Sequence, residues 1–326
     1  MGFILLPMFR AWLELARISN LPTVWTNVTA AWLLAGGPWV DARLGWLILA
    51  GSLLYTGGMI VNDAADLKFD REHRKERPIP SGKIGVLTAW GVGLGMILLG
   101  GWVGIRYTTV SFPLMAALVL AIIAYDLYHK PWPGAVWVMG SCRVLLFCMA
   151  GSAVIPDLMT SKGDLICPAY TLGLNMLHDM PRAVWIMGLT LGAYIVGLTM
   201  VARMEAKGAS VSPWRAFFAK ALLYAPAPVA TAFWLSRANW RLIPLLGDLT
   251  PLAPLPFILL FIAMVFHATR VMRRGGPDIG RAVGILLAGI AVVDALAVMQ
   301  VSLRLACGFV LLAPVLRLWQ RWIAAT

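Results

Sequence analysis

Residues 44–62 read LGWLILAGSLLYTGGMIVN, and residues 63–70, which follow directly, read DAADLKFD. The first stretch has no charged side chain and is close to the length of about 20 residues that an α-helix needs to cross the hydrocarbon core of a bilayer. The second stretch carries three aspartates within eight residues. The abrupt change predicts a membrane-spanning helix that ends at a polar surface.

The rest of the chain has the same apolar character. Of its 326 residues, 60% are hydrophobic and 13% are charged, against roughly 45–50% and 25% in soluble domains. A water-soluble fold is therefore excluded. The net charge of +12 would suggest nucleic acid in a soluble protein, but in an apolar chain it indicates membrane topology, so we expect no nucleic-acid partner. The cysteines and histidines show no metal-binding spacing.

Further runs of spanning length predict an all-α fold. We expect one domain over residues 1–326, a polytopic transmembrane helix bundle of nine core helices and a tenth C-terminal helix. The last run contains Arg304, Pro314 and Arg317 and could instead lie along the interface. The ten runs lie near residues 18–36, 44–62, 84–106, 109–127, 134–154, 183–202, 215–235, 252–272, 282–300 and 303–320.

The basic residues predict the orientation of this bundle. Lys and Arg in short loops are retained on the cytoplasmic side of a membrane. Most of the 27 basic residues lie in loops that share one side, and this is the side of the N-terminus. We therefore expect a multi-pass integral membrane protein with a cytoplasmic N-terminus.

The acidic residues are concentrated after the second run. Asp63, Asp66, Asp70, Glu72 and Glu76 are five of the fifteen acids in the chain. The i, i+3, i+7 spacing of the three aspartates places them on one face of a helix that continues through this segment. Oxygen ligands of this kind suit Mg²⁺, which often bridges carboxylates to a diphosphate. The alternative is a solvated loop in which neighbouring basic residues pair with the acids.

The order of these residues resembles a known motif. Residues 62–70 have the form NDxxDxxxD, and residues 77–82 read RPIPSG. This combination is similar to the first aspartate-rich motif of the UbiA superfamily of intramembrane prenyltransferases. The resemblance implies that Asp63, Asp66 and Asp70 bind Mg²⁺ and, through it, a polyprenyl diphosphate. It also implies that Asn62 contacts the metal or the diphosphate.

Two further basic residues match the family. The segment from Tyr125 to Lys130 resembles its tyrosine and lysine segment, which implies that Lys130 pairs with the diphosphate; an interfacial anchor is the alternative. Arg143 lies inside the fifth run, where an unpaired cation costs about 2.5–3.5 kcal/mol. A similar arginine in the family faces the central cavity, so its expected partner is the diphosphate or a motif aspartate. A structural pair with Asp126 is the alternative.

The first and ninth runs also carry polar residues. Residues 17–23 and Asn27 resemble the family's first helix, which implies that Asn27 contacts substrate. Asp294 lies at membrane depth, where a carboxylate needs a partner. It either lines the cavity or pairs with a polar group of a neighbouring helix.

The second aspartate-rich motif of the family is reduced in this chain. Residues 194–208 read YIVGLTMVARMEAKG, in which Glu205 is the one acidic residue and is flanked by Arg203 and Lys207. A segment of this type resembles a divergent branch of the superfamily from bacterial biosynthetic clusters. Either the two cations replace a second metal by neutralising the diphosphate, or the protein binds a prenyl group without transferring it.

The resemblance therefore implies a Mg²⁺-dependent prenyltransferase in a bacterial cytoplasmic (inner) membrane. It would transfer a polyprenyl chain from the diphosphate to an aromatic or other lipophilic acceptor. Tyr125 and Tyr194 are candidates to stabilise the allylic cation. The rival expectation is a non-catalytic carrier or transporter of a hydrophobic metabolite. The expected catalytic residues are Asp63, Asp66, Lys130 and Arg143, and the expected substrate contacts are Asn27, Asn62, Tyr125, Tyr194, Arg203, Glu205 and Lys207.

Overall fold

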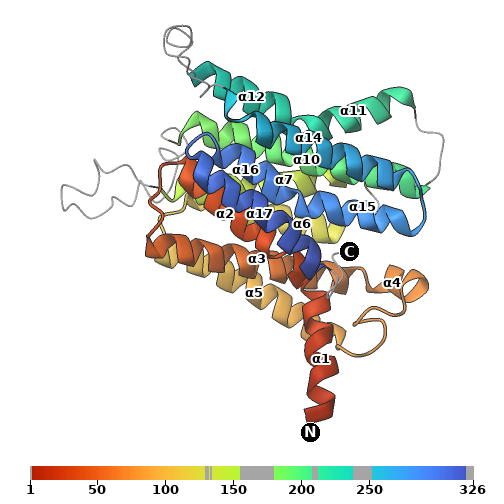
Figure 1. Ribbon diagram of the computed structural model, residues 1–326. Helices are drawn as coiled ribbons and strands as arrows, with labels where there is room; N and C mark the ends of the chain where they lie inside the picture. The colour runs from red at the N-terminus through yellow and green to blue at the C-terminus, as the bar shows by residue number, and fades with distance from the viewer. Residues whose placement is uncertain are drawn as a thin grey trace, which may run out of the picture.

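The computed structural model describes residues 2–128, 132, 134–154, 180–207, 212–237 and 252–320. The described chain is helical and contains no strand, which confirms the all-α prediction (Figure 1). Each of the ten predicted runs corresponds to one helix or to two consecutive helices. These are α2 (Pro22–Leu34), α3 (Ala42–Ala65), α5 (Val86–Tyr107), α6 (Phe112–Tyr128), α7 (Ala135–Ser152), α10 (Arg182–Lys207), α11 (Pro213–Tyr224), α12 (Pro226–Arg237), α14 (Leu255–Met272), α15 (Pro277–Ala288), α16 (Ile290–Val298) and α17 (Leu303–Trp319).

Not all of these helices have spanning length. Within the described residues, 6 helical segments are long and apolar enough to cross a membrane, counting α15 and α16 as one, and up to 7 if α11 and α12 are also one. Helix α6 is apolar but has 17 residues, and α17 also has 17. The bundle therefore combines full spans with shorter helices that depend on their neighbours.

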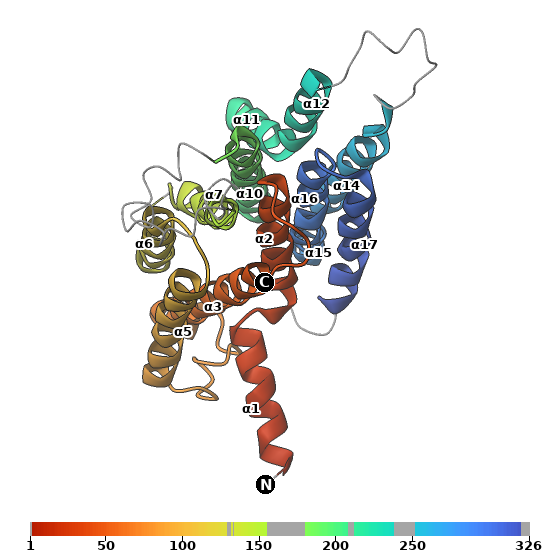
Figure 2. The same cartoon turned by 90° about the vertical axis from the view of Figure 1, so that its left-hand side faces the viewer.

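Helix α2 differs from the predicted span over residues 18–36. Arg17 has a left-handed backbone (φ 45°), a 3₁₀ turn follows at η1 (Ile18–Asn20), and Pro22 begins α2. With 13 residues, α2 is only about 20 Å long, less than the thickness of a bilayer core. All its residues except Trp25 are buried, and it lies in the middle of the bundle viewed end-on (Figure 2). Polar side chains of α2 therefore face other helices.

The run over residues 215–235 is also broken. Helix α11 ends at Tyr224 and α12 begins at Pro226, with a bend of 44° between them. Proline has no backbone N–H and disfavours a helical conformation at the preceding residue, which explains the break at Ala225. Two short helices replace the straight span.

Helix α17 packs within the bundle. It runs from Leu303 to Trp319 with Pro314 inside it, and it lies against α16 and α15. Its residues Ala306, Phe309 and Leu316 are buried and form its apolar contact with the bundle. It is therefore a C-terminal helix packed against the rest of the bundle.

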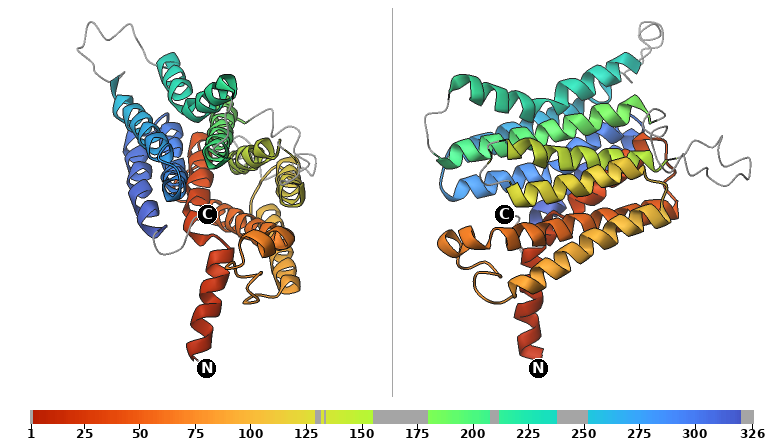
Figure 3. Two further views of the ribbon diagram at one scale, coloured as in Figure 1. Left: turned by 90° about the vertical axis from the view of Figure 1, so that its right-hand side faces the viewer. Right: turned by 180° about the vertical axis from the view of Figure 1, so that it is seen from behind.

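One end of the bundle carries the polar segments. Helix α3 ends there, and α4 (Leu67–His73) follows it with an exposed basic surface that includes Lys68, Arg71 and Arg74. Helix α1 (Gly2–Leu15) leaves the bundle at this end and runs crosswise to the other helices (Figures 1 and 3). The acidic motif therefore lies at a surface rather than in the middle of the bundle.

Glycines allow α3 and α5 to pack closely. A Cβ atom on Gly57 would lie 2.7 Å from the carbonyl oxygen of Gly93 and 3.0 Å from the backbone nitrogen of Ile97. Small residues at such contacts bring helix backbones together in membrane proteins. Because both neighbours are backbone atoms, neither can rotate away.

We predict that Gly57→Ala destabilises the protein by about 1–3 kcal/mol, since the added methyl group must push α3 and α5 apart. The measurement is thermal unfolding in detergent. Gly95→Ala in α5 is the matched control, because a Cβ atom there meets nothing within 4 Å, and both changes gain the same helix propensity. Equal melting temperatures for the two variants would contradict the close packing.

Candidate functional site

A cavity of about 840 Å³ opens at the polar end of the bundle. Residues of α3, α6, α7, α10, α15 and α16 line it. Its mouth carries charged side chains, which are Glu14, Arg17, Asp63, Arg74, Glu76 and Arg77. Its interior is lined mainly by apolar side chains, which include Leu118, Ile122, Leu146, Leu198, Leu287 and Ile290. The cavity thus joins a charged opening to an apolar interior.

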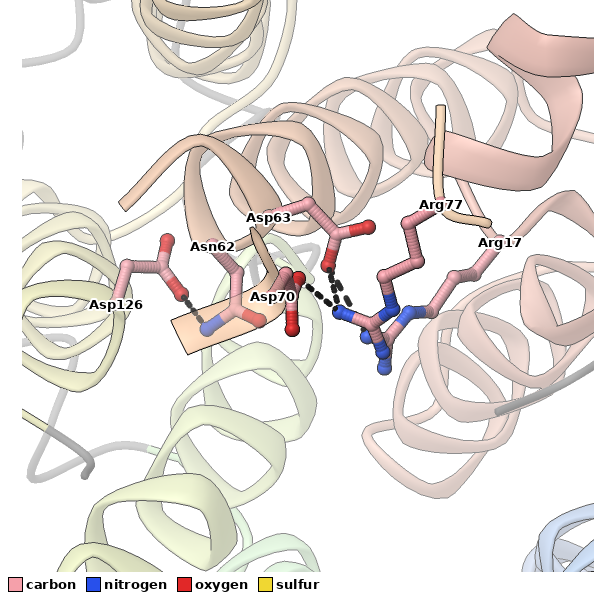
Figure 4. Close-up of polar contacts among 6 residues, drawn as sticks. All are labelled: Arg17, Asn62, Asp63, Asp70, Arg77 and Asp126. Carbon is pink, nitrogen blue, oxygen red and sulfur yellow. Dashed lines mark hydrogen bonds and ion pairs between the residues drawn. The ribbon is translucent and has the colours of Figure 1, made fainter. Parts of the chain in front are cut away.

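The motif aspartates are held by an arginine of the same motif. Asp63 lies in the last turn of α3, and Asp70 lies one helix further on, in α4. The Nη1 atom of Arg77 donates to Asp63 Oδ1 at 3.2 Å and to Asp70 Oδ2 at 2.8 Å (Figure 4). The expected continuous helix with all three aspartates on one face is not what the structure has, because α3 ends at Ala65 and α4 begins at Leu67. Asp63 and Asp70 nevertheless lie on either side of the same arginine.

A second arginine completes this cluster. Arg17 Nη2 donates to Asp63 Oδ1 at 3.2 Å, and the left-handed backbone at Arg17 lies just before the 3₁₀ turn. Burial opposes the charge of Arg17, but its pKa is raised, with attraction to Asp63 the largest favourable cause. The guanidinium is therefore charged. Arg17 and Arg77 thus both balance the negative charge of Asp63, and Arg77 also balances that of Asp70.

Asp126 is a site residue that the sequence reasoning did not assign to substrate or metal. It comes from α6, lines the cavity, and accepts a hydrogen bond from Asn62 Nδ2 at 3.3 Å (Figure 4). Its Oδ2 atom is buried and has no hydrogen-bond partner within the described residues. In the sequence, Asp126 stands out only as an acid at the end of an apolar run. Nothing in the sequence indicates that it contacts Asn62.

The oxygen atoms of the mouth suit a divalent metal ion. Asp70 Oδ1 and Asp126 Oδ2 are buried without a hydrogen-bond partner in the described part of the chain. Across those same residues, no three His, Cys, Asp or Glu side chains form a preformed metal cluster. Asp66 and Asp70, unlike Asp63 and Asp126, are absent from the described cavity lining. Mg²⁺ commonly uses one or two carboxylates and takes its remaining ligands from water and phosphate. The donors fit that mode of binding rather than a closed cage.

Arg143 lines the cavity, as expected, but its contacts with the protein are neither with a motif aspartate nor with Asp126. Its guanidinium donates to Asn27 Oδ1 at 2.6 Å and to Thr23 Oγ1 at 3.0 Å, and it lies over the ring of Tyr55 at 5.7 Å. Within the described residues it forms no ion pair with Asp126 or with a motif aspartate. Helix α2 therefore anchors this cation.

Asn27 is not placed as a direct substrate contact. Its side chain is fully buried and, within the described cavity wall, it is not a lining residue. Its Nδ2 atom donates to both carboxylate oxygens of Asp294, at 2.9 and 2.8 Å. The expectation that Asn27 faces the cavity is corrected, because the short α2 is enclosed by its neighbours. Asp294 pairs with a neighbouring helix, one of the two arrangements expected for it.

Tyr194 also points away from the cavity. It is fully buried, and its hydroxyl group donates to the carbonyl oxygen of Leu286 at 2.7 Å. This carbonyl lies next to the break between α15 and α16, where backbone groups lose helical partners. The predicted contact of Tyr194 with an allylic cation is therefore corrected. Tyr125, in contrast, lines the cavity.

The segment of the reduced second motif contributes one charged residue to the described cavity lining. Arg203 lines the cavity, whereas Glu205 is exposed and absent from the described lining. The side chain of Lys207 and the whole of Lys130 lie outside the described residues. The mouth thus contains carboxylates and arginines in front of an apolar interior, an arrangement suited to a molecule with an anionic head and an apolar tail.

The fold is shared with two solved structures. A structure of a digeranylgeranylglyceryl phosphate synthase superposes with a TM-score of 0.60 at 16% sequence identity, covering 90% of this chain and 99% of that one. A UbiA homologue from Aeropyrum pernix K1 superposes with a TM-score of 0.58 at 14% identity, covering 87% and 97%. At this identity the similarity concerns the fold.

Curated relatives match over shorter stretches. A digeranylgeranylglyceryl phosphate synthase of Ignicoccus hospitalis is 34% identical over 127 residues, which is 38% of this chain and 41% of the relative. A 4-hydroxybenzoate octaprenyltransferase of Paracidovorax citrulli is 35% identical over 127 residues, covering 36% and 38%. The matched stretches therefore span about two fifths of the length of these relatives.

The family profile covers much more of the chain. The profile of the UbiA prenyltransferase family matches residues 22–290. This range begins at the first residue of α2 and ends at the first residue of α16, and it includes the acidic motif and most of the residues that line the cavity. The chain is a member of the UbiA prenyltransferase family.

Proposed function

We propose that this protein is an intramembrane prenyltransferase, which moves a polyprenyl chain from its diphosphate to a lipophilic acceptor with the help of Mg²⁺. The observation that carries the proposal is the cavity, in which a charged mouth with Asp63, Arg17 and Arg77 leads to an apolar interior. A prenyl diphosphate has the same division into an anionic head and an apolar chain. On the basis of the basic residues, we assign the mouth and the N-terminus to the cytoplasmic side of a bacterial inner membrane.

The arginines of the mouth would bind the diphosphate. Arg17, Arg77 and Arg203 all line the cavity, and guanidinium groups form paired hydrogen bonds with phosphate oxygens. Arg17 and Arg77 both form ion pairs with Asp63. When a diphosphate binds, each arginine would exchange the Asp63 carboxylate for a phosphate group as its anionic partner. Positive charge at this position would stabilise the diphosphate as it leaves the allylic carbon.

The carboxylates of the mouth are the candidates for metal binding. Asp63 is the principal candidate because it lines the cavity, while Asp66 and Asp70 are the further candidates from the motif. Mg²⁺ bound there would supply a Lewis acid that neutralises the charge developing on the leaving diphosphate. Asp70 could bind through Oδ1, which has no hydrogen-bond partner among the described residues, while Arg77 contacts its Oδ2.

The interior would exclude water and hold the two reacting groups. The allylic C–O bond breaks, the acceptor forms a new bond to the allylic carbon, and the acceptor loses a proton. Apolar side chains keep water from the cation, and the rings of Tyr55 and Tyr125, which line the cavity, are placed to stabilise it. The named relatives use different acceptors, so an aromatic or another lipophilic acceptor fits the family.

The direct test uses purified protein with Mg²⁺, labelled isoprenyl diphosphates of several lengths and a bacterial membrane lipid extract. We expect a labelled lipid that does not form without Mg²⁺. Tight binding of the diphosphate without labelled product would instead support the rival function, a non-catalytic carrier.

We predict that Asp63→Asn lowers prenyl transfer by at least about a hundredfold, because loss of one charged ligand weakens both metal binding and the electrostatic stabilisation that depends on it. Mn²⁺ binding should fall in parallel, and the melting temperature should also fall, because Arg17 loses the Asp63 carboxylate as its counterion; activity is therefore compared at a temperature at which both proteins are folded. Glu72→Gln removes an equivalent charge from the exposed surface of α4 and should change none of these properties. Full activity of Asp63→Asn would overturn the assignment of this carboxylate.

We predict that Arg77→Gln binds Mn²⁺ about tenfold more tightly than the wild type, because it removes a positive charge that contacts both carboxylates. Its melting temperature without metal should fall, since Asp70 is left buried without a counterion. Metal titration and thermal unfolding measure the two effects.

Two further arginine variants control this prediction. Arg77→Lys keeps the charge and should bind Mn²⁺ like the wild type. Arg71→Gln removes an exposed charge from α4 and should leave Mn²⁺ affinity unchanged. Folded Arg77→Gln protein with unaltered affinity would contradict competition between Arg77 and the metal.

A further inference from the structure

Three polar side chains from three helices form a buried chain that ends at the cavity wall. Asp294 of α16 is 1% exposed and Asn27 of α2 is fully buried. Asn27 donates to both oxygens of Asp294 and accepts from Nη1 of Arg143, which belongs to α7. Of the three, only Arg143 lines the cavity. Asp294 therefore contacts the cavity cation through an intervening amide.

The amide can serve this arrangement in only one orientation. Its nitrogen donates and its oxygen accepts, so the Asp294 carboxylate holds the nitrogen side and leaves the oxygen for the guanidinium. If the amide were turned over, a carboxylate would face a carbonyl oxygen and a guanidinium would face an N–H group. Asp294 thus fixes the direction in which Asn27 presents its acceptor to Arg143.

The same chain balances charge inside the bundle. Asp294 and Arg143 are ionisable groups of opposite sign, and a charge on either one would be costly at membrane depth without the other. An amide separates Asp294 from Arg143, whereas at the mouth Arg77 contacts Asp63 and Asp70 directly. A direct pair would cover the guanidinium with a carboxylate, whereas the amide anchors it and leaves its charge available to a ligand.

The hydrogen bonds of Arg143 within the described residues all go to α2, and the ring of Tyr55 in α3 lies next to its guanidinium. These hydrogen bonds go to the backbone oxygen of Thr23 at 3.4 Å, to Thr23 Oγ1 at 3.0 Å and to Asn27 Oδ1 at 2.6 Å. A guanidinium has five N–H donors, and the group as a whole lines the cavity. The anchor on α2 sets the position of a cation whose other donors are available to the cavity.

We propose that Asp294 is a positioning residue for substrate binding, which acts through Asn27 to fix the Arg143 guanidinium where it binds an anionic group of a substrate. The anion is a phosphate or a carboxylate, and it belongs either to the prenyl donor or to the acceptor. This inference rests on the proposed function, because it assumes that the cavity binds these substrates.

The test is a set of double-mutant cycles read out by binding. The probes are a prenyl thiolodiphosphate, which resists ionisation, and 4-hydroxybenzoate, which represents an anionic acceptor. In the wild-type background, Asp294→Asn should weaken binding of at least one probe by about tenfold, the size expected for a misplaced charged hydrogen bond. Loss confined to the first probe assigns the anion to the donor, and loss confined to the second assigns it to the acceptor.

The decisive comparison is made in the Arg143→Gln background. If Asp294 acts through Arg143, Asp294→Asn should cause no further loss of affinity there. Asn27→Ala should reproduce the loss seen in Asp294→Asn, and the two changes combined should be no worse than either alone. Losses that add in the Arg143→Gln background, or unchanged affinity for both probes in the wild-type background, would overturn the proposal.

Two controls separate positioning from general destabilisation and from failure of the proposed function. Gln300→Met disturbs another buried polar contact at the end of α16, where Gln300 donates to the carbonyl oxygen of Ala230. It should lower the melting temperature without changing probe affinity. Wild-type protein that binds neither probe would refute the proposed function itself, whereas binding that is insensitive to Asp294 would refute only the positioning role.

Discussion

The structure depends on the pairing of charges that the bundle removes from water. Asp70 is nearly completely buried and is held by Arg77, which also contacts Asp63. Asp294 is balanced by Arg143 through Asn27. An unpaired charge in either place would cost several kcal/mol, so these contacts restrict how α2, α3, α4, α7 and α16 can be arranged. The same contacts place the candidate substrate-binding groups at the cavity. One set of side chains therefore serves both the stability of the bundle and its proposed function.

Helix α2 gives this arrangement its geometry. Because it is short and enclosed, its polar residues cannot reach lipid or water and instead connect the surrounding helices. Thr23 and Asn27 anchor Arg143 from α7, and Asn27 also binds Asp294 from α16. Close packing of α3 on α5 holds the acidic end of α3 at the mouth. The apolar end of the cavity is therefore formed by helices, whereas its charged end combines the end of α3 with Arg17 and the segment that follows α4.

The sequence predicted the bundle well because apolar runs and their lengths reflect the membrane directly. It predicted three aspartates on one face of a continuous helix, but the helix breaks at Asp66, and Asp63 and Asp70 are brought together by Arg77 instead. It did not reveal the break before α2, because the left-handed backbone at Arg17 has no glycine to indicate it. Tyr194 and Asn27 were assigned to the cavity because helices that are apolar on all sides do not show which face is lined by a pocket. The partners of Asp126 and Arg143 lie far away in the chain, and only the fold brings them together.

The central claim is that the mouth of the cavity binds a prenyl diphosphate through a divalent metal ion. The most direct measurement replaces Mg²⁺ with Mn²⁺ in purified protein and records phosphorus hyperfine coupling by pulsed electron paramagnetic resonance, with a bound prenyl thiolodiphosphate. We expect a protein-bound Mn²⁺ that is coupled to phosphorus and loses that coupling in Asp63→Asn. Bound thiolodiphosphate with no phosphorus-coupled Mn²⁺ in the wild-type protein would contradict binding of the diphosphate through the metal.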